Sequence, residues 1–127
     1  MRTQVCEMLG IEQPIVQAPM AAIPRLAAAV SNAGALGMVT LTWSADAGAV
    51  VRETAALTAR PFGGNLVLTE DHHRRLEEAL DAGLRIVSFM WGTLAATSSR
   101  CTTPEAWSCS RSALPNRRGG RSRPAWT

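Results

Sequence analysis

Two short segments of this chain combine residue types that can hold an aromatic ligand. Ala18-Pro19-Met20 joins a small residue and a stiff proline to a methionine, whose polarizable thioether can lie against a ring system. Gly63-Gly64-Asn65 joins two residues that permit close backbone approach to an amide that both donates and accepts hydrogen bonds. On residue types alone, packing at a strand end explains the first segment and a turn explains the second.

The adjacent histidines His72-His73 invite a metal proposal. They stand beside two arginines at what reads as the first turn of a helix, with no cysteine or carboxylate cluster at ligand spacing. Cys6, Cys101 and Cys109 are odd in number and widely spaced, with no CxxC pair. We therefore predict a solvated helix start, no metal site and no disulfide framework.

Apolar runs alternate with helix-favouring segments through the first 92 residues. Pro24 suits the first turn of a helix, Ser44 suits the cap of the next, and Gly34 and Gly83 suit helix ends. The segment 14–18 reads as a strand buried on both faces. We predict strands at 14–18, 35–40, 62–68 and 84–89, and helices at 24–32, 44–58 and 72–82.

This β-α-β-α-β-α-β order, with short connections, predicts right-handed crossovers and a parallel sheet. Four strands fit both an open doubly wound sheet and part of a (β/α)8 barrel. No basic N-terminal region leads into an apolar run, and polar residues and prolines interrupt the apolar stretch 14–41. The chain therefore predicts neither a signal peptide nor a membrane span, and we expect a cytoplasmic location.

The character of the chain changes after Gly92. Residues 1–92 carry seven Arg and nine Asp or Glu, a net charge of −2, whereas residues 93–127 carry six Arg and one Glu, a net charge of +5. We predict a partial α/β domain over 1–92 and a basic, disordered or frameshifted tail over 93–127. A change of reading frame near Gly92 explains the abruptness, since a neighbouring frame can encode an Ala-Gly-Gly turn followed by an apolar strand.

Three segments in order, residues 9–21, 26–37 and 60–66, resemble the nitronate monooxygenase family, formerly called 2-nitropropane dioxygenases. The resemblance covers roughly residues 7–92. It implies an FMN-dependent (β/α)8 barrel that oxidises alkyl nitronates with molecular oxygen. In such a barrel the site lies at the C-terminal ends of the strands, so Ala18, Pro19, Met20, Asn65 and the segment 88–91 would meet at one mouth. The resemblance makes the first four residues FMN contacts.

The family's catalytic histidine lies in a later Ala-Gly-His segment that this sequence lacks, so no catalytic residue is assigned. A barrel of this kind takes about 250 residues. We therefore expect the first half of an FMN-binding (β/α)8 barrel followed by an irregular tail, with weak or absent FMN binding, no turnover, and an exposed edge on the fourth strand through which copies could associate.

Two other functions compete with that interpretation. A related flavin barrel that reduces enoyl thioesters shares the early strand-end motif. Alternatively, the tail arginines, with Trp107 or Trp126 to stack on bases, would bind nucleic acid or an acidic surface. An out-of-frame translation of GC-rich DNA explains the same arginines, and we disfavour the nucleic-acid function.

Overall fold

The computed structural model describes residues 3–68, 72–91 and 107–110. The reading-frame hypothesis and the tail arginines lie outside the described residues. The elements in chain order are α1 (Gln4–Leu9), α2 (Pro24–Asn32), β1 (Gly37–Thr40), α3 (Ala47–Leu57), β2 (Phe62–Val67), α4 (His72–Asp81), β3 (Ile86–Met90) and β4 (Trp107–Ser110).

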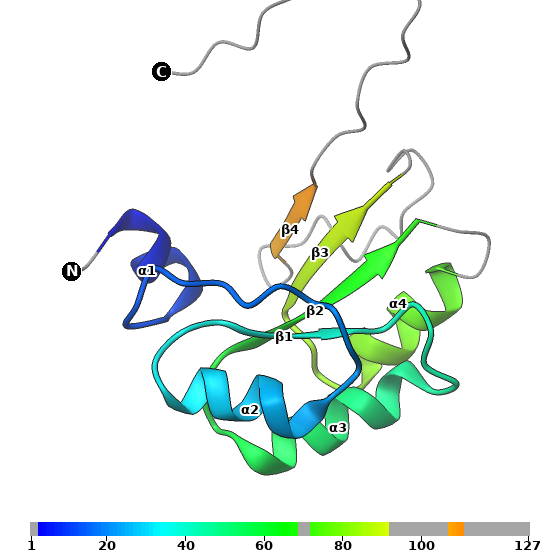
Figure 1. The fold of residues 1–127 in the computed structure, drawn as a ribbon. Coiled ribbons are helices and arrows are strands. Elements are labelled where there is room, and N and C mark those ends of the chain that lie inside the picture. The colour runs from blue at the N-terminus through cyan, green and yellow to red at the C-terminus, as the bar shows by residue number, and fades with distance from the viewer. Residues whose placement is uncertain (1–2, 69–71, 92–106, 111–127) are drawn as a thin grey trace, which may run out of the picture.

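The strands form one parallel sheet in the order β1-β2-β3-β4. Helices α2, α3 and α4 lie together on one side of this sheet (Figure 1). A doubly wound sheet reverses its strand order and carries helices on both faces, whereas a barrel adds each strand beside the last and keeps its helices outside. The winding is therefore that of a (β/α)8 barrel, which the alternation of elements in the sequence left undecided.

The main core fills the space between the sheet and these helices. Side chains alternate along a strand, so every second residue faces the helices. Val39, Leu66 and Val87, one from each of β1 to β3, are buried there with Val51 of α3 and Leu76 of α4. Leu76 and Ala79 are the buried residues of α4, and their spacing of three places them on one helix face.

Helix α1 packs against the rest of the chain through a second, smaller core. Cys6 of α1 and the following Ile11 are buried with Leu36 and Met38. Thr3 accepts a hydrogen bond from the Cys6 amide at the start of the helix, and Gly10 ends it with a φ of 68°. The sequence analysis assigned no helix here, because six residues are too few to show a helical period.

The predicted strand at 14–18 is wrong in its burial. The structure has an isolated parallel bridge between Val16 and Leu36, with the Gln17 amide donating to the Leu36 carbonyl at 2.9 Å. Ile15 is 59% exposed and Val16 is 51% exposed. Among the described residues only the β1 side of this segment has a pairing partner, and no second layer covers its apolar side chains.

Two further differences concern helix and strand ends. Asp46, not Ser44, caps α3, and its carboxylate accepts from the Ala49 amide at 2.8 Å, while Ser44 donates to the Leu41 carbonyl. Strand β4, which the sequence pattern did not indicate, pairs with residues 86–89 of β3. The expectation that the 84–89 strand leaves an exposed edge is therefore wrong. Within the described part of the chain, no helix has the length and apolar character of a membrane span.

Helix α2 approaches the sheet closely at Gly37. A Cβ on this residue would lie 1.9 Å from the Ala27 carbonyl oxygen of α2. Ser31 of α2 strengthens the same junction, since its hydroxyl donates to the Pro61 carbonyl at 2.8 Å and accepts from the Gly37 amide at 3.1 Å. Helix α2 thus holds the starts of β1 and β2 together.

The Gly37→Ala substitution should lower the free energy of unfolding by about 3 kcal/mol or more, because backbone atoms cannot move aside as a side chain could. Gly83→Ala is the control: its φ is +96° and nothing lies within 4 Å of the added methyl. The control should cost about 1–2 kcal/mol. Urea titrations of both variants measure the difference, and equal losses would contradict the packing of α2 on β1.

Candidate functional site

A row of three polar residues crosses the sheet on neighbouring strands. Thr40 of β1 is in register with Asn65 of β2, and Asn65 is in register with Ser88 of β3. Thr40 and Asn65 are 3% and 5% exposed, and Ser88 is half-buried. The row lies two residues beyond Met38 on β1, so it occupies the face opposite the helices. We call these three residues the polar row.

Two side chains of the polar row, Asn65 and Ser88, are hydrogen-bonded to each other. The third, Thr40, has no hydrogen bond among the described residues. The Ser88 hydroxyl donates to Asn65 Oδ1 at 2.8 Å, which leaves the Asn65 Nδ2 donor for another acceptor. The Thr40 hydroxyl is buried and has no hydrogen-bond partner among the described residues. Buried polar groups without a partner are rare and are costly to a fold.

The strand ends beside the polar row are held by a threonine two residues further on. The Thr42 hydroxyl accepts from the Val67 amide at 2.8 Å, and the Leu41 amide donates to the Asn65 carbonyl at 2.9 Å. Both bonds join the chain after β1 to β2 at the C-terminal ends of these strands. Thr42 and Thr40 are both buried, but of the two hydroxyls only that of Thr42 has a hydrogen-bond partner within residues 3–68 and 72–91.

The two glycines before Asn65 lie inside β2 and do not form a turn. A Cβ on Gly63 would be 2.5 Å from the Met38 sulfur and 3.2 Å from the Ile86 carbonyl oxygen. A Cβ on Gly64 would be 2.7 Å from Leu41 and from Leu84 on the opposite face. The strand predicted over 62–68 is thus confirmed for these residues, and the glycines let neighbouring strands and their side chains pack closely around β2.

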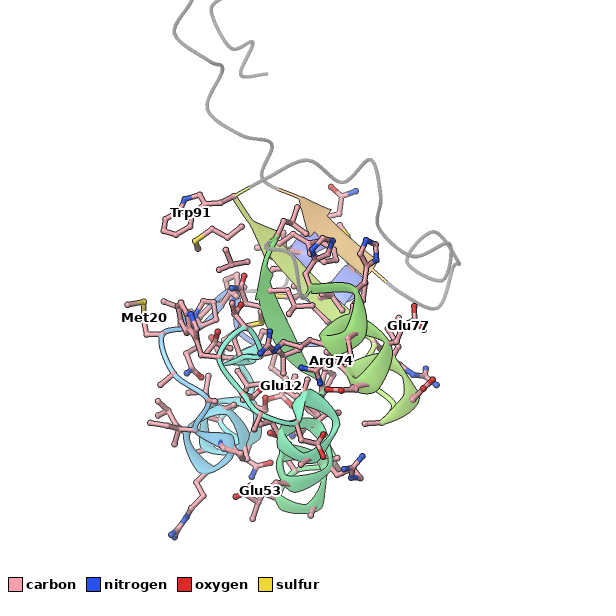
Figure 2. All side chains as sticks on the ribbon, turned by 90° about the vertical axis from the view of Figure 1, so that its right-hand side faces the viewer. Glu12, Met20, Glu53, Arg74, Glu77 and Trp91 are labelled. Atoms are coloured by element: carbon pink, nitrogen blue, oxygen red, sulfur yellow. The ribbon has the colours of Figure 1, made fainter. Side chains whose placement is uncertain are left out.

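The segment Ala18-Pro19-Met20 reaches the end of β1 but does not bury its methionine. The Met20 amide donates to the Ala18 carbonyl at 2.9 Å, and the Thr40 amide donates to the Ala21 carbonyl at 3.3 Å. Met20 is 81% exposed, and Figure 2 shows its side chain projecting outward. The structure therefore brings this segment beside the polar row and leaves Met20 outside it.

An apolar cavity of about 340 Å³ lies on the same face of the sheet as the polar row. Ser88 and Met38 line it from the strands, Pro19 from the first segment, and Met8 from α1. Its volume is in the range of small-molecule sites. A second cavity of about 420 Å³, lined by Arg60 and Arg85, opens at the N-terminal ends of β2 and β3, where barrels rarely place chemistry.

The other predicted features of the site are resolved as follows. His72 and His73 begin α4 with their ring centroids 4.2 Å apart, so they lie at a helix start as predicted. Within residues 3–68 and 72–91, no group of three metal-ligating side chains comes together. Trp91 follows the last residue of β3 and is exposed. Its φ of 50° is unusual for a bulky residue.

Comparison with known proteins identifies the family. A model of the family described as nitronate monooxygenase matches residues 2–93. The chain belongs to this family. A nitronate monooxygenase of Pseudomonas aeruginosa strain PAO1 is 50% identical over 70 residues, which are 52% of this chain and 20% of that protein. The resemblance carried by the three sequence segments is thus confirmed.

Two further comparisons extend the match. A (3aS,4S,5R,7aS)-5-hydroxy-7a-methyl-1-oxo-octahydro-1H-indene-4-carboxyl-CoA dehydrogenase of Mycobacterium tuberculosis is 37% identical over 95 residues, 70% of this chain and 26% of that protein. The structure of FabK from Thermotoga maritima superposes with a TM-score of 0.80 and 28% identity, over 87% of this chain and 37% of that chain. The fold is therefore part of a (β/α)8 barrel, and the family is one of flavin oxidoreductases.

The sequence predicts Asn65 as a cofactor contact and places Ser88 in the segment 88–91 at the mouth of the barrel. It gives no role to Thr40. The signal was present, because Thr40 closes a predicted strand whose alternate residues must share one face. What the sequence did not provide was the register between strands, which places Thr40 beside Asn65. Register here depends on contacts between residues about 25 positions apart.

Thr42→Val should lower the free energy of unfolding by about 1–3 kcal/mol, since it leaves the buried Val67 amide without an acceptor. Thr42→Ser keeps the hydroxyl and should recover most of that loss. Thermal or urea unfolding compares the two variants with the unsubstituted chain. A valine variant as stable as the serine variant would show that the strand ends do not depend on this bond.

Proposed function

We propose that this chain forms the first part of an FMN-dependent nitronate monooxygenase, with the cofactor at the C-terminal ends of β1 to β3. The observation that carries the proposal is the polar row, which lies at the strand ends of a barrel-type sheet in a chain of this family. Barrel enzymes build their sites at these ends. The matched relatives are much longer than the chain, so the activity of the whole enzyme is part of the proposal.

The residues present fit a flavin. An isoalloxazine ring has apolar faces and one polar pyrimidine edge. Pro19 and Ser88, which line the apolar cavity, would contact the faces, and the Asn65 amide, bonded to Ser88 though not itself lining this cavity, would contact the edge. Ala18 and Pro19 would form a backbone wall, and Met20 would turn inward from its exposed position to lie against the ring. Bound FMN would supply the electron acceptor for an alkyl nitronate, with oxygen as co-substrate.

The chain's own residues would bind and orient the cofactor and would not transfer the proton. The family's catalytic histidine belongs to an Ala-Gly-His segment that the sequence lacks, and His72 and His73 serve as the start of α4. We therefore propose no catalytic residue in this chain and expect no turnover of nitronates by it. The phosphate of FMN is commonly held by later loops of a barrel.

The second candidate function is that of a related flavin barrel that reduces enoyl thioesters. The Mycobacterium tuberculosis protein, named for a CoA-linked substrate, matches 70% of this chain, against 52% for the Pseudomonas protein. The elements that would hold the cofactor are proposed to serve alike in either enzyme. Substrate choice would therefore rest on loops beyond the matched segment.

We expect the purified chain to bind FMN weakly, with a dissociation constant on the order of 1 mM, or about −4 kcal/mol. The physical reason is that the polar row offers a few hydrogen bonds and leaves the phosphate without dedicated contacts. Riboflavin, which lacks the phosphate, is the matched control ligand and should bind with similar affinity. Titration followed by flavin fluorescence measures both constants.

Three results would contradict this account. Protein that is purified with stoichiometric flavin would show that the chain holds a complete site. A clear preference for FMN over riboflavin would show that the chain holds the phosphate itself. Turnover of a nitronate by the flavin-loaded chain would likewise overturn the expected inactivity.

A further inference from the structure

One hydroxyl of the polar row, that of Thr40, is buried and makes no hydrogen bond to the other described residues. Thr40 is 3% exposed, and its Oγ1 has no hydrogen-bond partner among the described residues. Valine has nearly the same shape and would carry no such cost at this position. Thr42, two residues on, shows the ordinary situation, because its buried hydroxyl accepts from the Val67 amide. A buried hydroxyl that makes no hydrogen bond within the described part of the chain is explained if it bonds a ligand.

Ser88 prepares a second donor next to this hydroxyl. Its own hydroxyl donates to Asn65 Oδ1 at 2.8 Å, so the amide oxygen faces Ser88 and the Nδ2 donor is directed away from it. In this arrangement Nδ2 is the group of Asn65 that can donate to a ligand. Because Asn65 is 5% exposed, its amide has little room for other arrangements.

The two donors have a spacing set by the sheet. Thr40 and Asn65 are paired in register on adjacent parallel strands, whose axes lie about 4.8 Å apart. Two donors at neighbouring positions match two acceptor atoms on one rigid ring. The pyrimidine edge of a flavin has this form, with two carbonyl oxygens on either side of one ring N–H.

We propose that Thr40 is a second ligand-contacting residue and that Ser88 is a positioning residue for Asn65, so that Thr40 and Asn65 together bind the dicarbonyl edge of a flavin ring. This inference rests on the proposed flavin site and adds to it the atoms that recognise the ring. The Thr40 hydroxyl, without a partner in the described ranges, gains one when the ligand binds. The fold is thereby less stable than it could be, in favour of binding.

The test uses the full chain labelled with ¹⁵N, titrated with lumiflavin, which has the ring system but neither ribityl chain nor phosphate. Thr40→Val should raise the midpoint of thermal unfolding by about 4–8 °C and weaken lumiflavin binding about 3- to 10-fold. Thr40→Ser retains the hydroxyl and should bind like the unsubstituted chain. Opposite changes in stability and affinity separate a ligand contact from a structural hydroxyl.

Ser88 is tested through the resonances of the Asn65 side-chain amide. Ser88→Ala should shift these resonances in the free protein and weaken lumiflavin binding by about 3- to 10-fold. Ser88→Thr keeps the donor and should restore both the resonances and the affinity. A change in affinity without any change in the Asn65 resonances would show that Ser88 does not act through Asn65.

The outcomes distinguish this inference from the proposed function. If the unsubstituted chain binds lumiflavin and Thr40→Val binds it equally well, the Thr40 contact is wrong and the flavin site stands. If Thr40→Val lowers the unfolding midpoint, the hydroxyl is structural and the inference is overturned. If neither lumiflavin nor FMN shifts any resonance up to the solubility limit, the flavin site and the Thr40 contact both fail.

Discussion

The arrangement of this part of a (β/α)8 barrel depends on close packing at positions that have no side chain. Gly37 admits the Ala27 carbonyl of α2 against β1, and Gly63 and Gly64 admit side chains on the two faces of β2. These contacts limit how the strands can slide, because a shift of one residue would move every side chain to the other face. The register that results places Thr40, Asn65 and Ser88 in one row. The position of the site thus follows from close packing at glycines that precede the polar row on β1 and β2.

The two faces of the sheet have different requirements. The face toward α2, α3 and α4 is filled by aliphatic side chains and supplies most of the buried apolar surface. The opposite face has a small apolar core under α1 near the starts of the strands and the polar row nearer their ends. Stability and recognition are therefore separated along the strands, as is usual in barrels. Because the core on the helix side supplies the stability, the fold tolerates the buried Thr40 hydroxyl, which has no partner among the described residues.

Much of the fold follows from local sequence signals. Pro24 and Gly34 bound α2 closely, and the apolar runs gave β1, β2 and β3 to within one or two residues. The failures have non-local causes. Val16 is exposed because its segment pairs on one side only, and Ser44 yields the cap to Asp46, whose carboxylate reaches the Ala49 amide. The site shows the same division: Asn65 could be named from its residue type and a family motif, whereas Thr40 required the register between strands.

The central claim is that the polar row begins a flavin site, and a crystal structure of the full chain soaked with FMN tests it most directly. The account predicts electron density for the isoalloxazine ring on the face opposite the helices, with acceptor atoms of its pyrimidine edge within hydrogen-bonding distance of Asn65 Nδ2 and Thr40 Oγ1. Density for the flavin at the N-terminal ends of the strands, beside Arg60 and Arg85, with the polar row empty, would contradict it.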